Sequence, residues 1–180
     1  YPYMHELIAS DWLYVVVAWL SLPNNQTADD NIENDTIRAS AYGCSGSMKG
    51  NYTVGNGKDF ATIADALNIL SVCGVGGPVV FQLDSGVYSS MSLSYVTGMS
   101  ATNTVTITSA SGKAEDVVFI GGSPVIDFAD AAHFRLTHVT VDAFSSTYAV
   151  RIIGNASDVQ VKYCNIILNP ATTSTQYGVY

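Results

Sequence analysis

The chain has 180 residues, of which 48% are hydrophobic and only 12% are charged, and its formal net charge is −8. A disordered chain carries more charge and fewer apolar residues, so this composition indicates a folded protein with a sizeable core. An acidic surface repels nucleic acid and anionic membranes, which argues against both as partners. The many Val, Ile, Thr, Ser, Gly and Tyr residues predict β-structure rather than a helix bundle.

The first 45 residues contain two predicted strands, 14–20 and 36–42, on either side of a polar loop at 24–35. The apolar run 12–22 is too short to cross about 30 Å of hydrocarbon as a helix, so we expect a buried strand and no membrane insertion. A lone hairpin is marginally stable. We therefore predict that these strands are the last ones of a β-sandwich, and that the chain is a piece of a longer protein with flanking domains.

The polar loop is the only place where the sequence suggests a cofactor. Its carboxylates could coordinate Ca²⁺, which prefers clustered oxygen ligands, although their spacing is not that of an EF-hand. The alternative is a solvated acidic loop in which Asn and Asp provide turn geometry. The residues concerned are Asp29, Asp30, Glu33 and Asp35.

The pattern of this segment resembles the end of bacterial adhesion-related immunoglobulin-like domains. The resemblance covers about a fifth of the chain and rests on Trp19, Asn25, Asp30, Asn31, Asn34, Asp35 and Thr36. It implies that residues 1–45 are the C-terminal strands of an immunoglobulin-like β-sandwich. The small-residue connector 43–50 is the predicted domain boundary.

The next stretch, 51–88, is predicted to contain one amphipathic helix between two short strands. Its apolar residues fall on one helical face and are Phe60, Ile63, Ala66, Leu67 and Leu70. Thr62 and Asp65 resemble a capping box. The run from Gly74 to Pro78 is expected to end the helix, and an apolar strand is expected at 79–83.

This stretch resembles the N-terminal cap of right-handed parallel β-helices, as in pectin-methylesterase-like and pectate-lyase-like proteins. The residues that carry the resemblance are Asp59, Phe60, Thr62, Ile63, Ala66, Val80, Phe81, Gly86 and Tyr88. It is also similar to large secreted surface proteins of Bacteroidota, through Gly50, Tyr52, Thr53, Val54, Gly55, Asp65, Asn68, Leu70, Cys73, Gly74, Val75, Gly77 and Pro78. The resemblance implies an all-β fold in which residues 46–180 form a capping helix and the first coils of a right-handed parallel β-helix, in an extracellular or cell-surface protein.

The second half of the chain contains an internal repeat. Segment 134–141 aligns with 159–166, and 125–128 aligns with 150–153, in both cases at an offset of 25 residues (159 − 134 and 150 − 125). Such an offset is typical of solenoids. Both copies interrupt their apolar alternation at the same place, at His138 and at Tyr163, which predicts a shared bend in successive coils.

Three cysteines are present, without a C-x-x-C spacing that would indicate zinc or redox chemistry. Cys44 and Cys73 flank the opening strand and the helix, and they could form a disulfide in an exported protein. Three free thiols are the alternative. Cys164 lies in an apolar strand and is predicted to be a small core residue.

The sequence contains no recognisable catalytic constellation. Enzymes of the resembled family use paired Asp, Gln and Arg residues, Ca²⁺-binding Asp residues with a basic residue, or several close Asp residues. No such pair stands out among Asp127, Asp130, Arg135, Asp142, Arg151, Asp158 and Lys162. We therefore predict no catalytic residue and no metal ligand in this chain.

The repeat does place polar and aromatic side chains together on its outer surface. We predict a glycan-binding face, because aromatic rings stack on sugar CH groups and polar side chains pair with hydroxyls. The predicted residues are Arg135, His138, Gln160, Lys162, Tyr163 and Asn165. The alternative is an ordinary solvated face.

The functional hypothesis is a non-catalytic, adhesin-like surface module that binds a polysaccharide or a cell-surface glycan. Two alternatives stay open: the N-terminal part of a polysaccharide lyase, esterase or hydrolase whose catalytic coils lie beyond residue 180, and a structural stalk that binds nothing.

Overall fold

A computed structural model describes residues 3–9, 13–20 and 36–180, with the backbone alone up to residue 42. The chain divides into two compact units, Tyr1–Ser45 and Gly46–Tyr180. We call them the N-terminal unit and the coil unit and describe each by itself.

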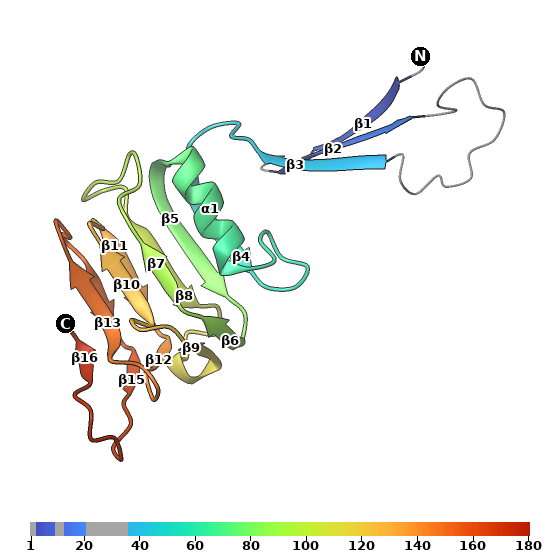
Figure 1. Ribbon diagram of the computed structural model, residues 1–180. Helices are drawn as coiled ribbons and strands as arrows, with labels where there is room; N and C mark the ends of the chain where they lie inside the picture. Colours follow the sequence, from blue (N-terminus) through green and yellow to red (C-terminus); the bar gives the residue numbers. More distant parts are fainter. Residues whose placement is uncertain (1–2, 10–12, 21–35) are drawn as a thin grey trace, which may run out of the picture. The chain divides into compact units, whose positions relative to one another are not determined.

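The N-terminal unit is an antiparallel sheet with the strand order β1-β2-β3 (Figure 1). The strands are β1 (Tyr3–Ala9), β2 (Leu13–Leu20) and β3 (Thr36–Tyr42). The two predicted strands are present and pair with each other. β1 was not predicted, because its sequence YMHELIA does not alternate between apolar and polar residues. The proposed calcium loop at 24–35 lies outside the described residues.

The coil unit begins with β4 (Met48–Val54), α1 (Ile63–Cys73) and β5 (Val75–Leu83). Thr62 is the N-cap of α1, and its hydroxyl accepts a hydrogen bond from the Asp65 amide, as the capping pattern predicts. Gly74 ends the helix at a φ of 65°. The helix packs against β4 and β5 (Figure 1). Its buried side includes Ile69, whereas the predicted Leu67 is only half-buried.

The predicted break before the next strand is wrong. β5 begins directly at Val75, and Pro78 lies inside it. The register between β4 and β5 is irregular at this point. Met48 pairs with Val75 but Gly50 pairs with Val79, so β5 advances by four residues where β4 advances by two. A proline, which has no amide hydrogen to donate, is tolerated at such an irregularity.

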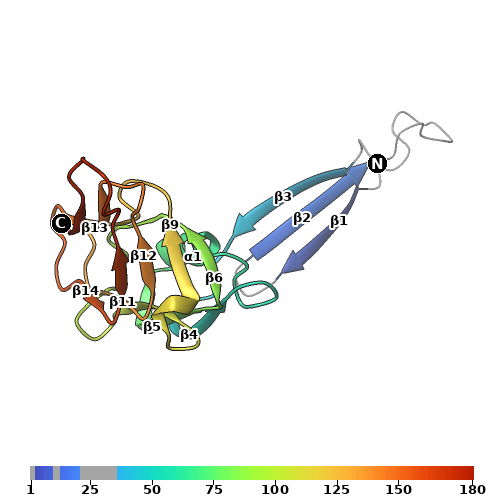
Figure 2. The ribbon, with the colours of Figure 1, turned by 90° about the horizontal axis from the view of Figure 1, so that it is seen from below.

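Three parallel sheets form the rest of the coil unit. Sheet 1 has the order β14-β11-β8-β5-β4, sheet 2 the order β15-β12-β9-β6 and sheet 3 the order β16-β13-β10-β7. From β5 on, the chain visits sheets 1, 2 and 3 in turn and then repeats the cycle, and we call each cycle a coil. Figure 2 shows β6, β9 and β12 of sheet 2 side by side. The arrangement is compatible with a parallel β-helix.

The strands of the four coils are short. The first coil continues with β6 (Gly86–Ser89) and β7 (Met91–Leu93), and the second has β8 (Val105–Ser109), β9 (Val117–Ile120) and β10 (Ile126–Ala129). A 3₁₀ turn (Ala114–Asp116) precedes β9. The third coil has β11 (Phe134–Thr137), β12 (Thr140–Asp142) and β13 (Tyr148–Ile153), and the fourth has β14 (Gln160–Lys162), β15 (Asn165–Ile167) and β16 (Tyr177–Val179).

The predicted repeat is confirmed in sheets 1 and 2 and is wrong by one residue in sheet 3. Arg135 pairs with Gln160, which is the predicted offset of 25. In sheet 3, Ile126 pairs with Val150, an offset of 24 (150 − 126). Val125 and Ile126 are both fully buried, so apolarity alone does not distinguish the two registers. The extra residue lies in the turn at 154–156 between the third and fourth coils, because Ala129 pairs with Ile153 and Ala132 with Ser157.

The core lies inside the stack of coils. Side chains of successive coils stack in the pairing register, as in the parallel pairs Phe81–Ile107, Ile107–Leu136 and Phe119–Val141. All five of these residues are at most 1% exposed. The equivalent positions Val161 and Ile166 of the fourth coil are half-buried.

Of the two alternatives for Cys44 and Cys73, the disulfide is the one that the structure contains, and Cys164 is a free cysteine. Cys164 is half-buried and its thiol donates to the Leu136 carbonyl oxygen, 3.5 Å away. Burial raises the pKa of this thiol.

Candidate functional site

Four of the six predicted glycan-face residues lie on three strands, and the other two lie at the corners between strands. Arg135 on β11 and Gln160 on β14 are direct neighbours in sheet 1, and Lys162 follows on the same strand. His138 and Tyr163 lie at the corners between sheets 1 and 2, because each follows the last residue of its sheet 1 strand. Asn165 belongs to sheet 2.

The corner residues have an unusual backbone. His138 has a φ of 50° and Tyr163 a φ of 56°. This left-handed conformation turns the chain sharply from sheet 1 into sheet 2 and is uncommon for residues other than glycine. The two rings stack at a centroid distance of 5.0 Å and an interplanar angle of 22°. The predicted shared bend is thereby confirmed, and Tyr163 remains 74% exposed.

Thr140, the first residue of β12, does not extend the exposed face. Thr140 is only 4% exposed, and its hydroxyl donates to the Ala114 carbonyl oxygen at 2.8 Å. The chain has already turned into sheet 2 at this position, so the outward alternation of sheet 1 does not continue. Asn165, one coil later, is exposed, and its side-chain amide lies 3.4 Å from the Thr140 hydroxyl.

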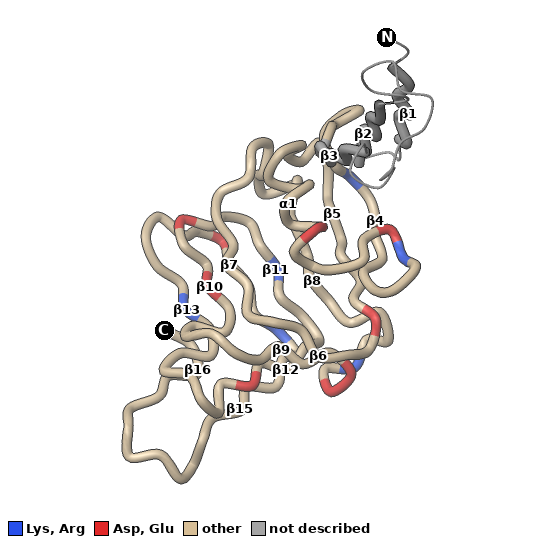
Figure 3. Tube along the Cα trace, turned by 45° about the vertical axis from the view of Figure 1, so that its right-hand side comes forward, with Lys and Arg blue, Asp and Glu red and all other residues tan. Residues whose placement is uncertain are grey.

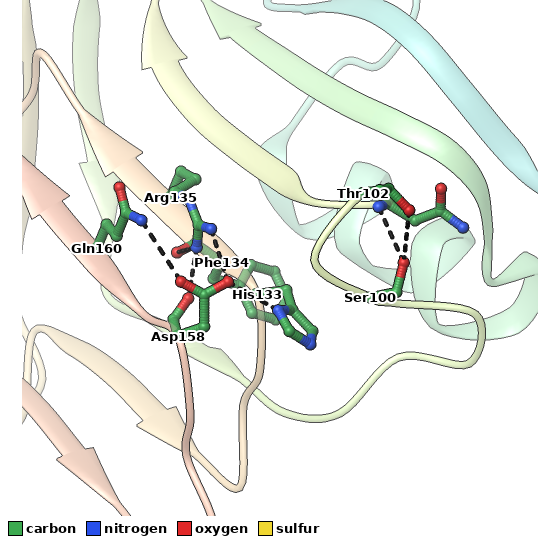
Figure 4. A network of polar contacts seen from close by, with 8 residues as sticks. Ser100, Thr102, His133, Phe134, Arg135, Asp158 and Gln160 are labelled. Atoms are coloured by element: carbon green, nitrogen blue, oxygen red, sulfur yellow. Dashed lines mark hydrogen bonds and ion pairs between the residues drawn. The ribbon is translucent and has the colours of Figure 1, made fainter.

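A second cluster joins the third and fourth coils at the other end of the sheet 1 strands (Figure 4). One carboxylate oxygen of Asp158 lies 2.8 Å from His133 Nδ1 and 2.7 Å from Arg135 Nη2. Arg135 also donates to the Asp158 and Phe134 carbonyl oxygens. Gln160 approaches the other carboxylate oxygen at 3.4 Å. Arg135 is therefore engaged within the protein, although it was predicted to be a ligand-binding residue.

The cluster strongly stabilises the ionised form of its carboxylate. The hydrogen bond from Arg135, followed by that from His133, lowers the pKa of Asp158 to about 2. A carboxylate with such a low pKa is a poor proton acceptor near neutral pH. The cluster is consequently suited to holding successive coils together rather than to general acid–base catalysis.

This shift predicts a specific dependence of stability on pH. The pKa of Asp158 is lower in the folded chain than the value of about 3.9 in an unfolded one, so its contribution to stability is present above pH 4 and is lost as pH falls to about 2. We expect Asp158→Asn to lower the urea midpoint at pH 7, and the deficit to shrink between about pH 4 and pH 2.

The matched control is Glu115→Gln, which removes an exposed carboxylate that makes no hydrogen bond or ion pair within the described part of the chain. Its urea midpoint should follow that of the unmodified protein at each pH. A deficit for Asp158→Asn that stays constant down to pH 2 would contradict the assigned pKa.

Sheet 3 carries a second charged pair on its outer face. Arg151 on β13 donates to both carboxylate oxygens of its register partner Asp127 on β10, at 3.0 and 2.7 Å. These hydrogen bonds raise the pKa of Arg151. Asp127 is thereby paired with a cation, so its carboxylate also serves a structural role.

Charged residues do not gather on the coil unit. Figure 3 shows Lys, Arg, Asp and Glu scattered along the stack without a basic patch. Among the described residues, no group of three or more His, Cys, Asp or Glu residues could hold a metal ion. Nor does this part of the chain contain a helix that is long and apolar enough to cross a membrane.

Two exposed features were not predicted. Tyr148, Tyr177 and Tyr180 form a cluster in sheet 3 with centroid distances of 5.1–5.3 Å. A hollow of about 310 Å³ lies where Phe144–Thr147 faces the loop before β16. The pairing of Tyr148 with Tyr177 has an offset of 29 residues (177 − 148), so the 25-residue repeat could not reveal it.

Comparisons of this chain with protein-family models, with curated proteins and with solved structures found no match.

Proposed function

We propose that the coil unit is a right-handed parallel β-helix of the pectin-lyase-like kind and that it acts as a non-catalytic glycan-binding module on a secreted or surface protein. The cyclic order of the three parallel sheets supports the fold, and the strong right-handed preference of parallel crossovers supports the hand. The capping position of α1 supports the pectin-lyase-like kind of β-helix. The resemblance of residues 50–88 to surface proteins of Bacteroidota supports a secreted or surface protein. In this proposal the N-terminal unit is part of an immunoglobulin-like domain.

The observation that carries the binding proposal is the exposed ring of Tyr163. The His138 ring stacks on one face of the Tyr163 ring, and this contact fixes the orientation of the tyrosine ring. The residue follows β14, the last strand of sheet 1 in the 180-residue chain, and is 74% exposed. A rigid aromatic face bordered by polar side chains is suited to the CH face of a sugar ring, with hydroxyls paired to neighbouring groups. The exposed neighbours are Lys162 and Asn165.

The electrostatics support a binding role over a catalytic one. Two of the carboxylates on the coils, Asp158 beside sheet 1 and Asp127 on sheet 3, are held by arginines. Polysaccharide hydrolysis by paired carboxylates needs one of them to donate a proton near neutral pH. The disulfide is compatible with an extracellular location, because disulfides persist in oxidising compartments.

The proposal is tested by probing a glycan array with the labelled 180-residue chain. We expect binding to a subset of glycans and a loss of about tenfold in Tyr163→Ala, because stacking on an exposed ring contributes roughly that factor. The matched control is Tyr95→Ala, which removes another exposed tyrosine, 61% exposed, from the loop after β7.

Equal loss in both variants, or binding unaffected by Tyr163→Ala, would contradict the assigned surface. Release of new reducing ends or unsaturated products from a bound polysaccharide would favour the enzyme instead. A chain that binds no glycan would be a structural stalk.

A further inference from the structure

We infer that the hollow between the β12–β13 turn and the loop before β16 is a separate binding site for one neutral sugar residue. The choice of ligand class rests on the glycan binding proposed above. The site shares no residue with the Tyr163 surface and stands on its own geometry. Its volume of about 310 Å³ is near the lower end of the range for small-molecule sites, which suits a single ring rather than an extended chain.

The wall formed by the β12–β13 turn is fixed by several hydrogen bonds. The Phe144 amide donates to Asp142 Oδ1 at 2.9 Å, and the Thr147 amide donates to Ser123 Oγ at 3.0 Å. The Ser146 hydroxyl donates to the Gly122 carbonyl oxygen. This wall is therefore held by the preceding coil, and its shape does not depend on a ligand.

Gln176 ties the opposite wall to the first one. Its side-chain nitrogen donates to the carbonyl oxygens of Ala143 and Ser146 at 2.9 and 2.8 Å. Its side-chain oxygen accepts a hydrogen bond from the Asn169 amide at 2.8 Å. One side chain thus joins the two walls of the hollow, and its hydrogen-bonding groups are used for structure rather than for recognition.

Other polar groups of the hollow are free to bind a ligand. The hydroxyls of Ser145, Thr147 and Thr175 and the side-chain nitrogen of Asn169 make no hydrogen bond to any described residue. The three hydroxyl residues are exposed. Hydroxyls both donate and accept, so such a set matches the hydroxyls of a sugar ring.

The aromatic and uncharged residues that line the hollow limit the class of ligand that it can bind. Phe144 lines the hollow and is 54% exposed, which provides an aromatic surface beside the hydroxyls. Every lining residue in the described part of the chain is uncharged. Phosphorylated, sulfated or uronic sugars would find no cation to pair with, so a neutral sugar fits best.

Amide chemical-shift mapping of the ¹⁵N-labelled 180-residue chain tests this inference. The probes are methyl glycosides of glucose, galactose, mannose and fucose, each at about 20 mM, above the roughly millimolar Kd expected for one sugar residue. We expect at least one probe to shift the amides of 144–147 and 169–176. Phe144→Ala should weaken that binding about fivefold, and Thr175→Val should weaken it while keeping the side-chain shape.

Tyr163→Ala is the control and should leave the shifts in the hollow unchanged. Shifts confined to the surroundings of Tyr163 would overturn the inference and leave the proposed function intact. Shifts in the hollow without any Tyr163-dependent binding on the array would support the inference and contradict the proposed surface. No shift in either region would overturn the inference.

Discussion

Truncation of Phe81 to alanine is expected to destabilise the coil unit by about 3–5 kcal/mol, the usual cost of emptying a buried aromatic site. Phe81 is 0% exposed and lies on β5, between the pairing partners Tyr52 on β4 and Ile107 on β8. Its ring centroid lies 6.0 Å from those of Tyr52 and Phe60. The substitution therefore leaves a cavity where Tyr52 and Phe60 pack against the first coil.

The matched control is Phe144→Ala, the same substitution at a residue that is 54% exposed. Its effect should remain within about 0.5 kcal/mol, as for most surface substitutions. This result would also show that a loss of sugar binding in Phe144→Ala is not a loss of fold.

Urea unfolding followed by far-UV circular dichroism measures both effects on the coil unit. Tryptophan fluorescence is unsuitable, because Trp12 and Trp19 are the only tryptophans and both lie in the N-terminal unit. Similar midpoint shifts for the two variants would contradict the assignment of Phe81 to the core.

The core of the coil unit could be predicted well because burial and periodicity coincide there. Segment 134–141 repeats at 159–166 with the register that the structure shows, and its interruption marks the corner at His138. The prediction failed by one residue in sheet 3, where two adjacent buried residues fit either register. A one-residue slip normally moves the apolar side chains of a strand to its other face, but Val125 and Ile126 are both fully buried and so do not distinguish the two registers.

The candidate site was predicted only in part, because its residues take their roles from contacts between coils. Arg135 was predicted to face a ligand, yet it is held by Asp158. His133 and Asp158 occupy equivalent positions one offset apart (158 − 133 = 25), and both have a positive φ. The 25-residue repeat could have revealed this pair. Apolar alternation, however, predicts only the strands, and both residues lie outside the strands.

The hollow could not be predicted from the repeat, because it arises where the repeat is broken. The link from Asp142 to Tyr148 spans 6 positions, and the equivalent link from Ile167 to Tyr177 spans 10 (148 − 142 and 177 − 167). The four additional residues lengthen the loop before β16, and this loop forms the second wall of the hollow. Loops of this kind carry function in many folds, because the regular scaffold positions them without constraining their sequence.

Substitution of Gly98 by alanine is the other change with a large expected effect. Gly98 has a φ of +88°, and a Cβ atom there would lie 2.1 Å from the Val75 carbonyl oxygen. The adjacent Thr97 carbonyl oxygen accepts a hydrogen bond from the Val75 amide at 2.9 Å, so the loop after β7 lies directly against the start of β5. Backbone strain and overlap together should cost about 3–5 kcal/mol.

Gly112→Ala separates the two causes. Gly112 also has a positive φ, +73°, but a Cβ atom there would meet nothing within 4 Å. This variant should therefore lose only the cost of the left-handed backbone, about 1–2 kcal/mol. Urea midpoints followed by circular dichroism give the difference between the variants, which measures how closely the loop must approach β5. If the two variants lose the same free energy, the close approach does not stabilise the fold, and the loop is free to move away from the end of the coil unit where α1 packs.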